Sequence, residues 1–81
     1  MKSSEKLCWV YMTAGSIEDA KKIGQKLVEK NLAACVNLLE NMTSIFKWGD
    51  KLEEGQEVGM IAKTRKALMP KLIGTVNSLQ L

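Results

Sequence analysis

The stretch from residue 32 to residue 64, LAACVNLLENMTSIFKWGDKLEEGQEVGMIAKT, decides the fold. Residues 32–48 are rich in apolar and β-branched side chains, which favour an extended strand. Gly49, Asp50 and Lys51 have turn composition, and residues 52–64 return as a second run. One face of that run carries Val58, Met60 and Ala62 at every second position. The stretch therefore predicts a long antiparallel hairpin.

Two polar residues, Glu40 and Asn41, interrupt the apolar part of the first hairpin strand. A polar pair at this place is typical of a β-bulge, where one strand gains a residue and the ladder is locally disturbed. We expect the regular pairing of the hairpin to break there.

A strand and a helix are predicted before the hairpin. Residues 7–13 (LCWVYMT) are apolar on both faces, which favours a central strand that is covered on two sides. Ser16 with Asp19 three residues later resembles a capping box, and apolar residues follow at helical spacing. Asn31, which tolerates the left-handed conformation, is expected to end this helix.

A second amphipathic helix is predicted after the hairpin. Pro70 falls in its first turn, where the missing N–H costs little, and the apolar positions are Leu68, Leu72, Ile73, Val76 and Leu79. The order strand, helix, strand, strand, helix predicts an α+β chain with a ferredoxin-like βαββα(β) sandwich whose last strand is absent. We expect one domain over residues 1–81, with residues 1–6 as a flexible tail.

Composition excludes several classes of protein. The 81 residues carry a net charge of +3, with basic residues spread among acids, so no nucleic-acid partner is expected. The longest apolar run is far below the ~20 residues that span a bilayer, so no membrane association is expected. The first six residues lack a secretory pattern, which predicts a cytoplasmic protein with both cysteines, Cys8 and Cys35, free.

Three motifs resemble one known family. They are LAACVN at residues 32–37, TSIFKW at 43–48, and EV at 57–58 followed by KT at 63–64. In this order they look like the signatures of the CutA-type divalent-cation tolerance proteins, and the resemblance runs from about Val10 to Leu79. It implies a ferredoxin-like homotrimer without enzyme activity, associated with tolerance to metal ions and with copper or other divalent-ion binding. A chain this short with a hairpin this long also needs a neighbour to cover it.

The sequence departs from the family pattern in three places, one of which is the acid near the start of the first helix, offset here by Gly15 and Ser16. Family members follow the second helix with a His-Pro-Tyr segment and a final strand, whereas Gln80 stands here where the family has the histidine. Met12 stands where some members carry a cysteine. In the expected strand order 4-1-3-2, loss of the final strand leaves one edge of residues 7–13 unpaired, and we expect a neighbouring segment to cover that edge.

Soft donors are the candidate metal ligands. Thiolate and thioether sulfur prefer copper(I), which makes Cys35 the first candidate and Cys8 the second. Three methionines could assist: Met12, Met42 and Met60. The competing interpretation is ordinary core packing, since free cysteine and methionine are often buried.

Charged clusters give weaker hypotheses. Acids near the hairpin tip could bind hard divalent ions, although a solvated turn is the favoured interpretation: Asp50, Glu53, Glu54 and Glu57. Basic residues at the entry to the second helix, with Thr64 as a cap, could bind an anion: Lys63, Arg65 and Lys66. That junction supports an alternative function as a PII-like trimeric module that binds a small ligand in signalling. Phe46 and Trp48 are expected to pack at a subunit boundary.

Catalysis has little support from the sequence. The chain has no histidine to act as a base near neutral pH, and no P-loop or GxSxG motif. A small acylphosphatase-like hydrolase remains a second alternative that rests on fold analogy alone.

Overall fold

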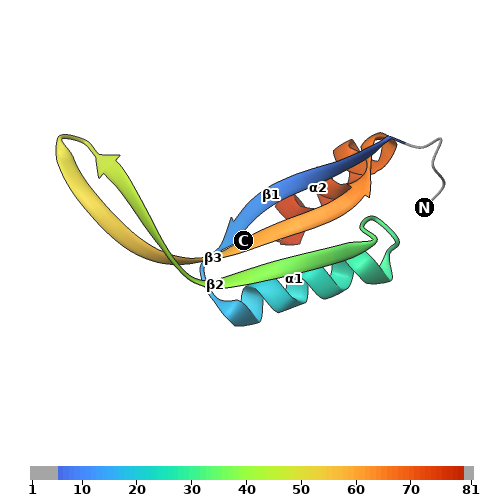
Figure 1. The fold of residues 1–81 in the computed structure, drawn as a ribbon, viewed down its shortest axis with the longest axis horizontal. Coiled ribbons are helices and arrows are strands. Elements are labelled where there is room, and N and C mark those ends of the chain that lie inside the picture. Colours follow the sequence, from blue (N-terminus) through green and yellow to red (C-terminus); the bar gives the residue numbers. More distant parts are fainter. Residues whose placement is uncertain (1–5, 80–81) are drawn as a thin grey trace.

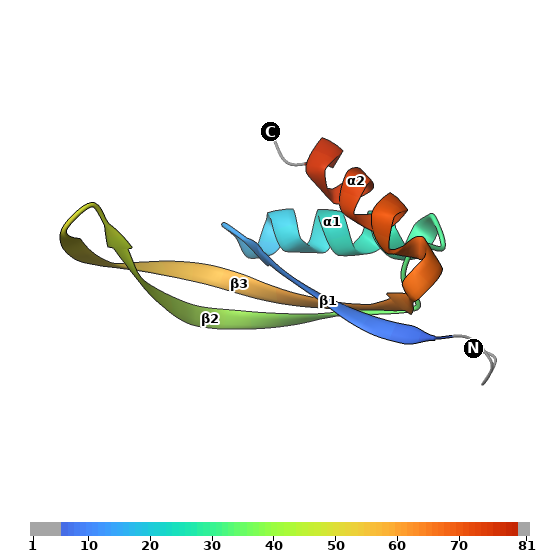
Figure 2. The same cartoon turned by 90° about the horizontal axis from the view of Figure 1, so that it is seen from above.

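A computed structural model describes residues 6–79, which form one three-stranded antiparallel sheet covered on one side by two helices (Figures 1 and 2). The strand order in the sheet is β1-β3-β2. The predicted order of elements is confirmed: β1 (Leu7–Ala14), α1 (Ile17–Glu29), β2 (Cys35–Trp48), β3 (Lys51–Arg65), a 3-10 turn η1 (Lys66–Leu68) and α2 (Met69–Leu79). The predictions for residues 1–5 and for Gln80 lie outside the described residues.

The limits of α1 follow the predicted signals. The Asp19 N–H donates to Ser16 Oγ at 3.2 Å, so a side chain satisfies one of the free donors in the first turn. Asn31 has a φ of 58° and turns the chain away from the helix. The buried side of α1 consists of Ala20, Ile23, Gly24 and Leu27.

β2 begins at Cys35, three residues later than predicted. Leu32 and Ala33 are buried, but their N–H groups donate to the Leu27 carbonyl at 2.9 and 3.2 Å. These two residues therefore complete the end of α1 instead of pairing in the sheet. Their apolar character reflects burial under the helix, which the sequence alone does not distinguish from a strand.

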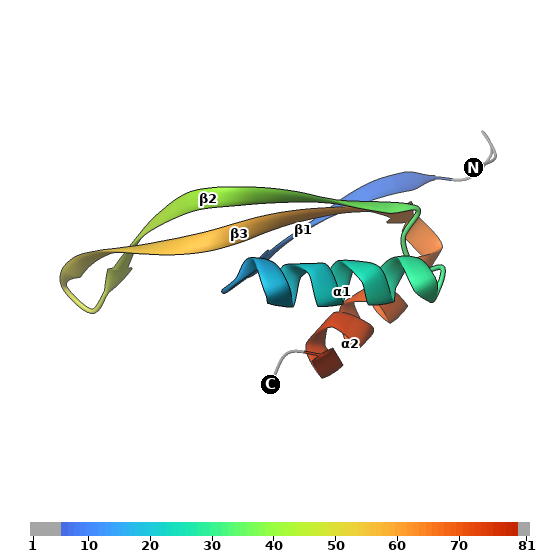
Figure 3. The same ribbon diagram turned by 90° about the horizontal axis from the view of Figure 1, so that it is seen from below.

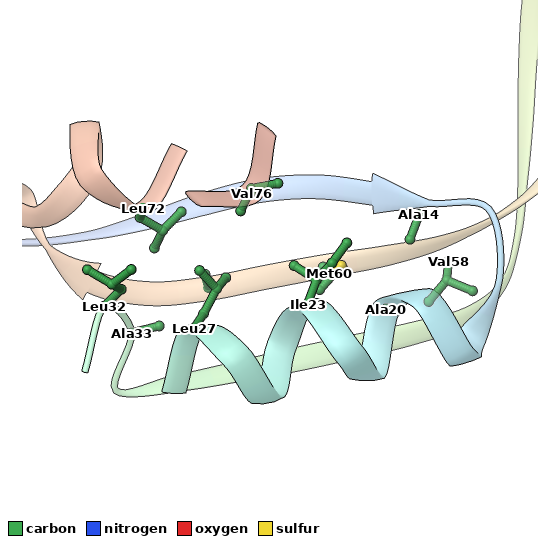
Figure 4. Close-up of a cluster of buried hydrophobic side chains, with 11 residues drawn as sticks. Ala14, Ala20, Ile23, Leu27, Leu32, Ala33, Val58, Met60, Leu72 and Val76 are labelled. Atoms are coloured by element: carbon green, nitrogen blue, oxygen red, sulfur yellow. The ribbon is translucent and has the colours of Figure 1, made fainter. Parts of the chain in front are cut away.

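The hydrophobic core lies between the sheet and both helices (Figure 4). Leu27 of α1, Met60 of β3 and Leu72 of α2 are completely buried there. Val58, Met60 and Ala62 share the core side of β3, as predicted. Thr64 was expected to cap the second helix, and this prediction is wrong: Thr64 is buried, and its hydroxyl donates to the Leu32 carbonyl. The hydroxyl thereby satisfies a buried acceptor in the loop between α1 and β2.

The hairpin of β2 and β3 extends well beyond the core (Figure 1). Its register shifts between Leu39 and Met42, where Asn41 has a φ of 61°, so the predicted irregularity is confirmed. Gly49, with a φ of 65°, opens the two-residue turn at the tip. The molecule measures 46 × 23 × 21 Å, and its radius of gyration of 14.2 Å exceeds the value of about 12 Å for a compact chain of this length. We call residues 42–57 the arm.

β1 differs from the prediction of a strand covered on two sides. One side of the strand, with Cys8, Val10 and Met12, faces the helices. On the other side, Trp9 is 69% exposed and Tyr11 is 60% exposed. Within residues 6–79, β1 pairs only with β3, so it is an edge strand. The uniformly apolar composition of residues 7–13 hid this two-sidedness, because an alternation is visible only when the exposed positions are polar.

Candidate functional site: the open face of the sheet

The side of the sheet opposite the helices carries no covering element among the described residues (Figure 3). Strand alternation and the observed register define its members, and we call this surface the open face: Leu7, Trp9, Tyr11, Thr13, Cys35, Asn37, Leu39, Gly59, Ile61 and Lys63. Four large apolar side chains on it are exposed: Leu7, Trp9, Tyr11 and Leu39. An exposed apolar patch of this kind marks an interaction surface.

One row across the open face joins Trp9, Lys63 and Cys35. Trp9 of β1 and Cys35 of β2 both lie directly opposite Lys63 of the central strand. The Lys63 ammonium lies 5.2 Å from the centroid of the Trp9 ring, a distance at which a cation and an aromatic ring attract each other. Lys63 is thus directed toward the indole. Cys35 Sγ lies 3.6 Å from Asn37 Oδ1, to which the thiol can donate.

The two candidate thiols lie on opposite faces of the sheet. Cys8 is paired with Thr64, which is on the core side, whereas Cys35 is paired with Lys63 on the open face. β3 lies between their strands. Both cysteines are free and half-buried. Within one chain, they therefore neither bind a common ion nor form a disulfide.

The three candidate methionines are also separated. Met60 is completely buried in the core, and Met12 packs against the core from β1. Met42 follows the bulge and lies over Gly59, whose missing Cβ leaves room for the Met42 sulfur. The Tyr11 hydroxyl points at that sulfur at 4.0 Å. Met42 is thus the one methionine of the three that extends the open face.

The acidic residues of the arm do not converge. Glu53 and Glu57 lie on one side of the ribbon and Glu54 lies on the other, because successive residues of a strand alternate. Asp50 lies in the turn. Glu57 accepts a hydrogen bond from Ser44 at 2.7 Å. Across residues 6–79, no group of three or more Cys, Asp or Glu side chains is close enough to hold a metal ion. The favoured interpretation of a solvated turn fits this arrangement.

The basic residues at the end of β3 lie in two different places. Lys63 is on the open face against Trp9, while Arg65 and Lys66 line a separate hollow with Lys6. The helix that follows begins with the three-residue η1, which has no side-chain cap. The Lys66 N–H instead donates to the Lys6 carbonyl at 2.9 Å. This hydrogen bond joins the residue before β1 to the residue after β3, at the junction for which the sequence suggested an anion site.

The arm continues the apolar character of the open face. Trp48 at its tip is 76% exposed, and Phe46 lies against Gly55 and is also exposed. Ile45 and Leu52 expose large apolar surfaces on the other side of the ribbon. An isolated two-stranded ribbon is at best marginally stable in water. The arm and the open face therefore form one continuous candidate interface.

Sequence reasoning missed the row of Trp9, Lys63 and Cys35 because it depends on register. The usable signal was the large apolar side chain at every second position of residues 7–11: Leu7, Trp9 and Tyr11. Those residues form one face of a strand whatever its partners are. Which residue of β2 joins them is fixed only by the pairing with β3.

A single sheet with two helices on one face, an uncovered second face and a long β2–β3 arm defines a ferredoxin-like protein with an exposed interaction surface. The sequence model of the CutA1 divalent ion tolerance protein family matches residues 8–80. The chain belongs to this family.

Individual relatives agree with this assignment. Protein CutA of Homo sapiens is 46% identical over 68 residues, which cover 84% of this chain and 38% of the human protein. The crystal structure of the divalent ion tolerance protein CutA1 from Ehrlichia chaffeensis superposes with a TM-score of 0.89 at 30% identity, over 95% of this chain and 72% of that one. The structure of the periplasmic divalent cation tolerance protein CutA from Archaeoglobus fulgidus gives 0.84 at 38% identity, over 90% and 71%.

These relatives are longer than the chain described here. The chain spans less than half of the human protein and about seven tenths of each of the two solved chains. Neither helix in the described part of the chain is long and apolar enough to cross a membrane.

Proposed function

We propose that this protein acts in tolerance to divalent metal ions as a non-enzymatic homotrimer whose subunits meet through the open face and the arm. The observation that carries the proposal is the exposed apolar surface shared by Trp9, Tyr11, Phe46 and Trp48. Aromatic residues are enriched at the centres of protein interfaces. The number of subunits comes from the family resemblance, and the surface supports the association itself.

Copper binding belongs to the same proposal, with Cys35 as the ligand. One chain offers a single thiol on the open face, which is too few ligands for a tight copper(I) site. A symmetric trimer that buries the open face supplies three copies of this thiol to one assembly. Metal binding is therefore expected to depend on association, and Cys8 on the opposite face is not expected to take part.

The experiment is a titration of the reduced 81-residue protein with copper(I) in competition with a chromogenic chelator. The variant is Cys35→Ser, and the matched control is Cys8→Ser, which removes the other half-buried thiol. We expect Cys35→Ser to lose copper binding and Cys8→Ser to retain it. Equal binding by the wild type and by Cys35→Ser would remove this residue from the site, and binding by a monomer would separate the metal site from the assembly.

A cytoplasmic location is also part of the proposal, and it rests on the sequence argument alone. The relative from Archaeoglobus fulgidus is described as periplasmic, so members of the family need not share one compartment. Fractionation of cells that express the tagged protein tests this point. Recovery of the protein outside the cytoplasmic fraction would contradict it.

A further inference from the structure

The open face carries a positive charge at one place. Among the described residues that form this face, Lys63 alone is charged, and none of the others is a carboxylate. Its side chain is half-buried, and its ammonium lies 5.2 Å from the centroid of the Trp9 ring. An aromatic ring attracts a cation but does not neutralise it. If another subunit covers the open face, the ammonium loses water, and a carboxylate must then offset that cost.

The arm carries the opposite charge, with four acidic residues against two lysines. Glu53 and Glu57 lie on the side of the ribbon that continues the open face, and Glu54 lies on the other side. Glu57 is half-buried and accepts a hydrogen bond from Ser44 at 2.7 Å, so part of its capacity as an acceptor is used. Glu53 is exposed and lies directly opposite Phe46. Glu53 is therefore the arm carboxylate best placed to meet a cation.

The body and the arm thus present two complementary pairs of side chains. On the open face, the ring of Trp9 lies beside the ammonium of Lys63. On the arm, Phe46 is paired across the ribbon with the carboxylate residue Glu53. Contact between the two surfaces would bring ring against ring and carboxylate against ammonium, and both kinds of contact are favourable once water is excluded.

One chain cannot make this contact by itself. Glu53 and Lys63 are ten residues apart on the same strand, which separates them by roughly 33 Å at about 3.3 Å per residue. The tip of the hairpin and the end of β3 lie at opposite ends of the molecule (Figure 1). The contact must therefore join two copies of the chain. Because the two surfaces are different, the contact is head to tail, and contacts of this type can close into a ring.

The contact does not depend on what lies at the edges of the sheet. The open face is the flat side of the three strands, whereas a further strand would pair in the plane of the sheet. Strands added at either edge would leave the Lys63 side chain on an uncovered surface.

We propose that the arm of one copy lies on the open face of the next copy, and that Glu53 of this arm forms an ion pair with Lys63 of that face. The inference rests on the proposed function, because it requires an assembly through the open face and the arm. It adds the residue that each copy contributes to its neighbour. The ion pair fixes where the arm rests, since a displaced arm would leave the ammonium buried without a carboxylate.

Charge reversal tests the pair by sedimentation of the 81-residue protein over a series of concentrations. Lys63→Glu and Glu53→Lys each bring like charges together, so each should raise the concentration needed for assembly by about thirtyfold or more. The double variant exchanges the two charges and should assemble near the wild-type concentration. Glu54→Lys is the matched control, because it makes the same change at the neighbouring exposed position on the other side of the ribbon. This variant should assemble as the wild type does.

A cross-link in the wild type supplies a reading that does not depend on the variants. A carbodiimide joins a carboxylate to an amine as an amide and takes up the water that is lost. Cleavage at the methionines then separates Glu53 and Lys63 on fragments 43–60 and 61–69. In an assembly of mixed nitrogen-14 and nitrogen-15 chains, mass spectrometry should find these two fragments linked with one light and one heavy member. The cross-link decides the matter where a variant does not fold.

The outcomes separate this inference from the proposed function. If the wild type assembles and both reversed variants assemble equally well, the ion pair is wrong and the assembly stands. The same holds if Glu53→Lys and Glu54→Lys weaken assembly by the same factor, because only the net charge of the arm would then matter. An assembled wild type without the link between Glu53 and Lys63 also overturns the pair. A wild type that remains a single chain at every concentration overturns both proposals.

Discussion

The two faces of the sheet are built from the same three strands, yet one is buried under the helices and the other is exposed. On the covered face, Met60 is completely buried against the helices (Figure 4), and Ala62 of the same strand is also completely buried. On the open face, Trp9 and Tyr11 are more than half exposed although they are adjacent in sequence to core-facing residues. The covered face is completed within one chain and gives the fold. The open face is apolar without a cover, and we infer that it gives the assembly.

The largest expected effect is on the covered face. Leu27→Ala removes a completely buried side chain of α1, and its loss should lower the free energy of unfolding by about 2–5 kcal/mol. Urea unfolding followed by circular dichroism measures this change. The loss should appear at every protein concentration, since the contact lies within one subunit. A loss below about 1 kcal/mol would show that the core is not where the structure places it.

The corresponding change on the open face is Trp9→Ser. The Trp9 ring is 69% exposed and lies beside the Lys63 ammonium on the open face, so the substitution should leave the isolated subunit folded but should remove about 2 kcal/mol or more from association. The reading is the urea midpoint at two protein concentrations. The wild-type midpoint should rise with concentration, by mass action, and the variant should lose this dependence. A midpoint of the wild type that does not change with concentration would contradict an assembly.

The junction between body and arm is expected to be sensitive to Gly59. A Cβ at this position would collide with the Met42 sulfur, so Gly59→Ala should cost about 1–3 kcal/mol in thermal or urea unfolding. Met42→Ala vacates the space, and the double variant should recover most of the loss imposed by Gly59→Ala. Additive effects of the two substitutions would show that Met42 and Gly59 do not contact each other.

The smallest expected effect is at the bulge. Asn41 has a φ of 61°, where a side chain other than Asn or Asp is strained, so Asn41→Ala should cost about 1 kcal/mol. Asn41→Gly is the control and should cost less, because glycine adopts this conformation without strain. Comparison of the two variants by thermal unfolding separates backbone strain from the loss of the amide. If glycine is the more harmful replacement, the side chain of Asn41 matters more than its backbone.

Local signals in the sequence predicted much of the fold. Ser16 and Asn31 mark the two ends of α1, and Glu40 with Asn41 marks the bulge, because each of these features depends on only a few neighbouring residues. The start of β2 and the role of Thr64 were missed. The role of Thr64 depends on a contact with Leu32, which is far away in sequence. The start of β2 depends on the N–H groups of Leu32 and Ala33, which bond to the Leu27 carbonyl at the end of α1, and apolar residues give no sign of that arrangement.

The candidate site was less accessible to prediction. Cys35 and Cys8 were both proposed as ligands, but only register shows that they lie on opposite faces. A shift of one residue in the pairing would have exchanged the faces. The exposure of Trp9 was hidden for a different reason, since a strand with apolar residues on both sides gives no sign of which side meets a helix and which meets another subunit.

The most direct test of the account is the mass of the wild-type protein in solution, measured by sedimentation at micromolar concentration. The account predicts a species of three times the 9.0 kDa of one chain, which Trp9→Ser converts to folded single chains. A well-folded wild-type protein that sediments at 9.0 kDa at the same concentration would contradict the account, because the exposed apolar side chains of the open face would then not drive association.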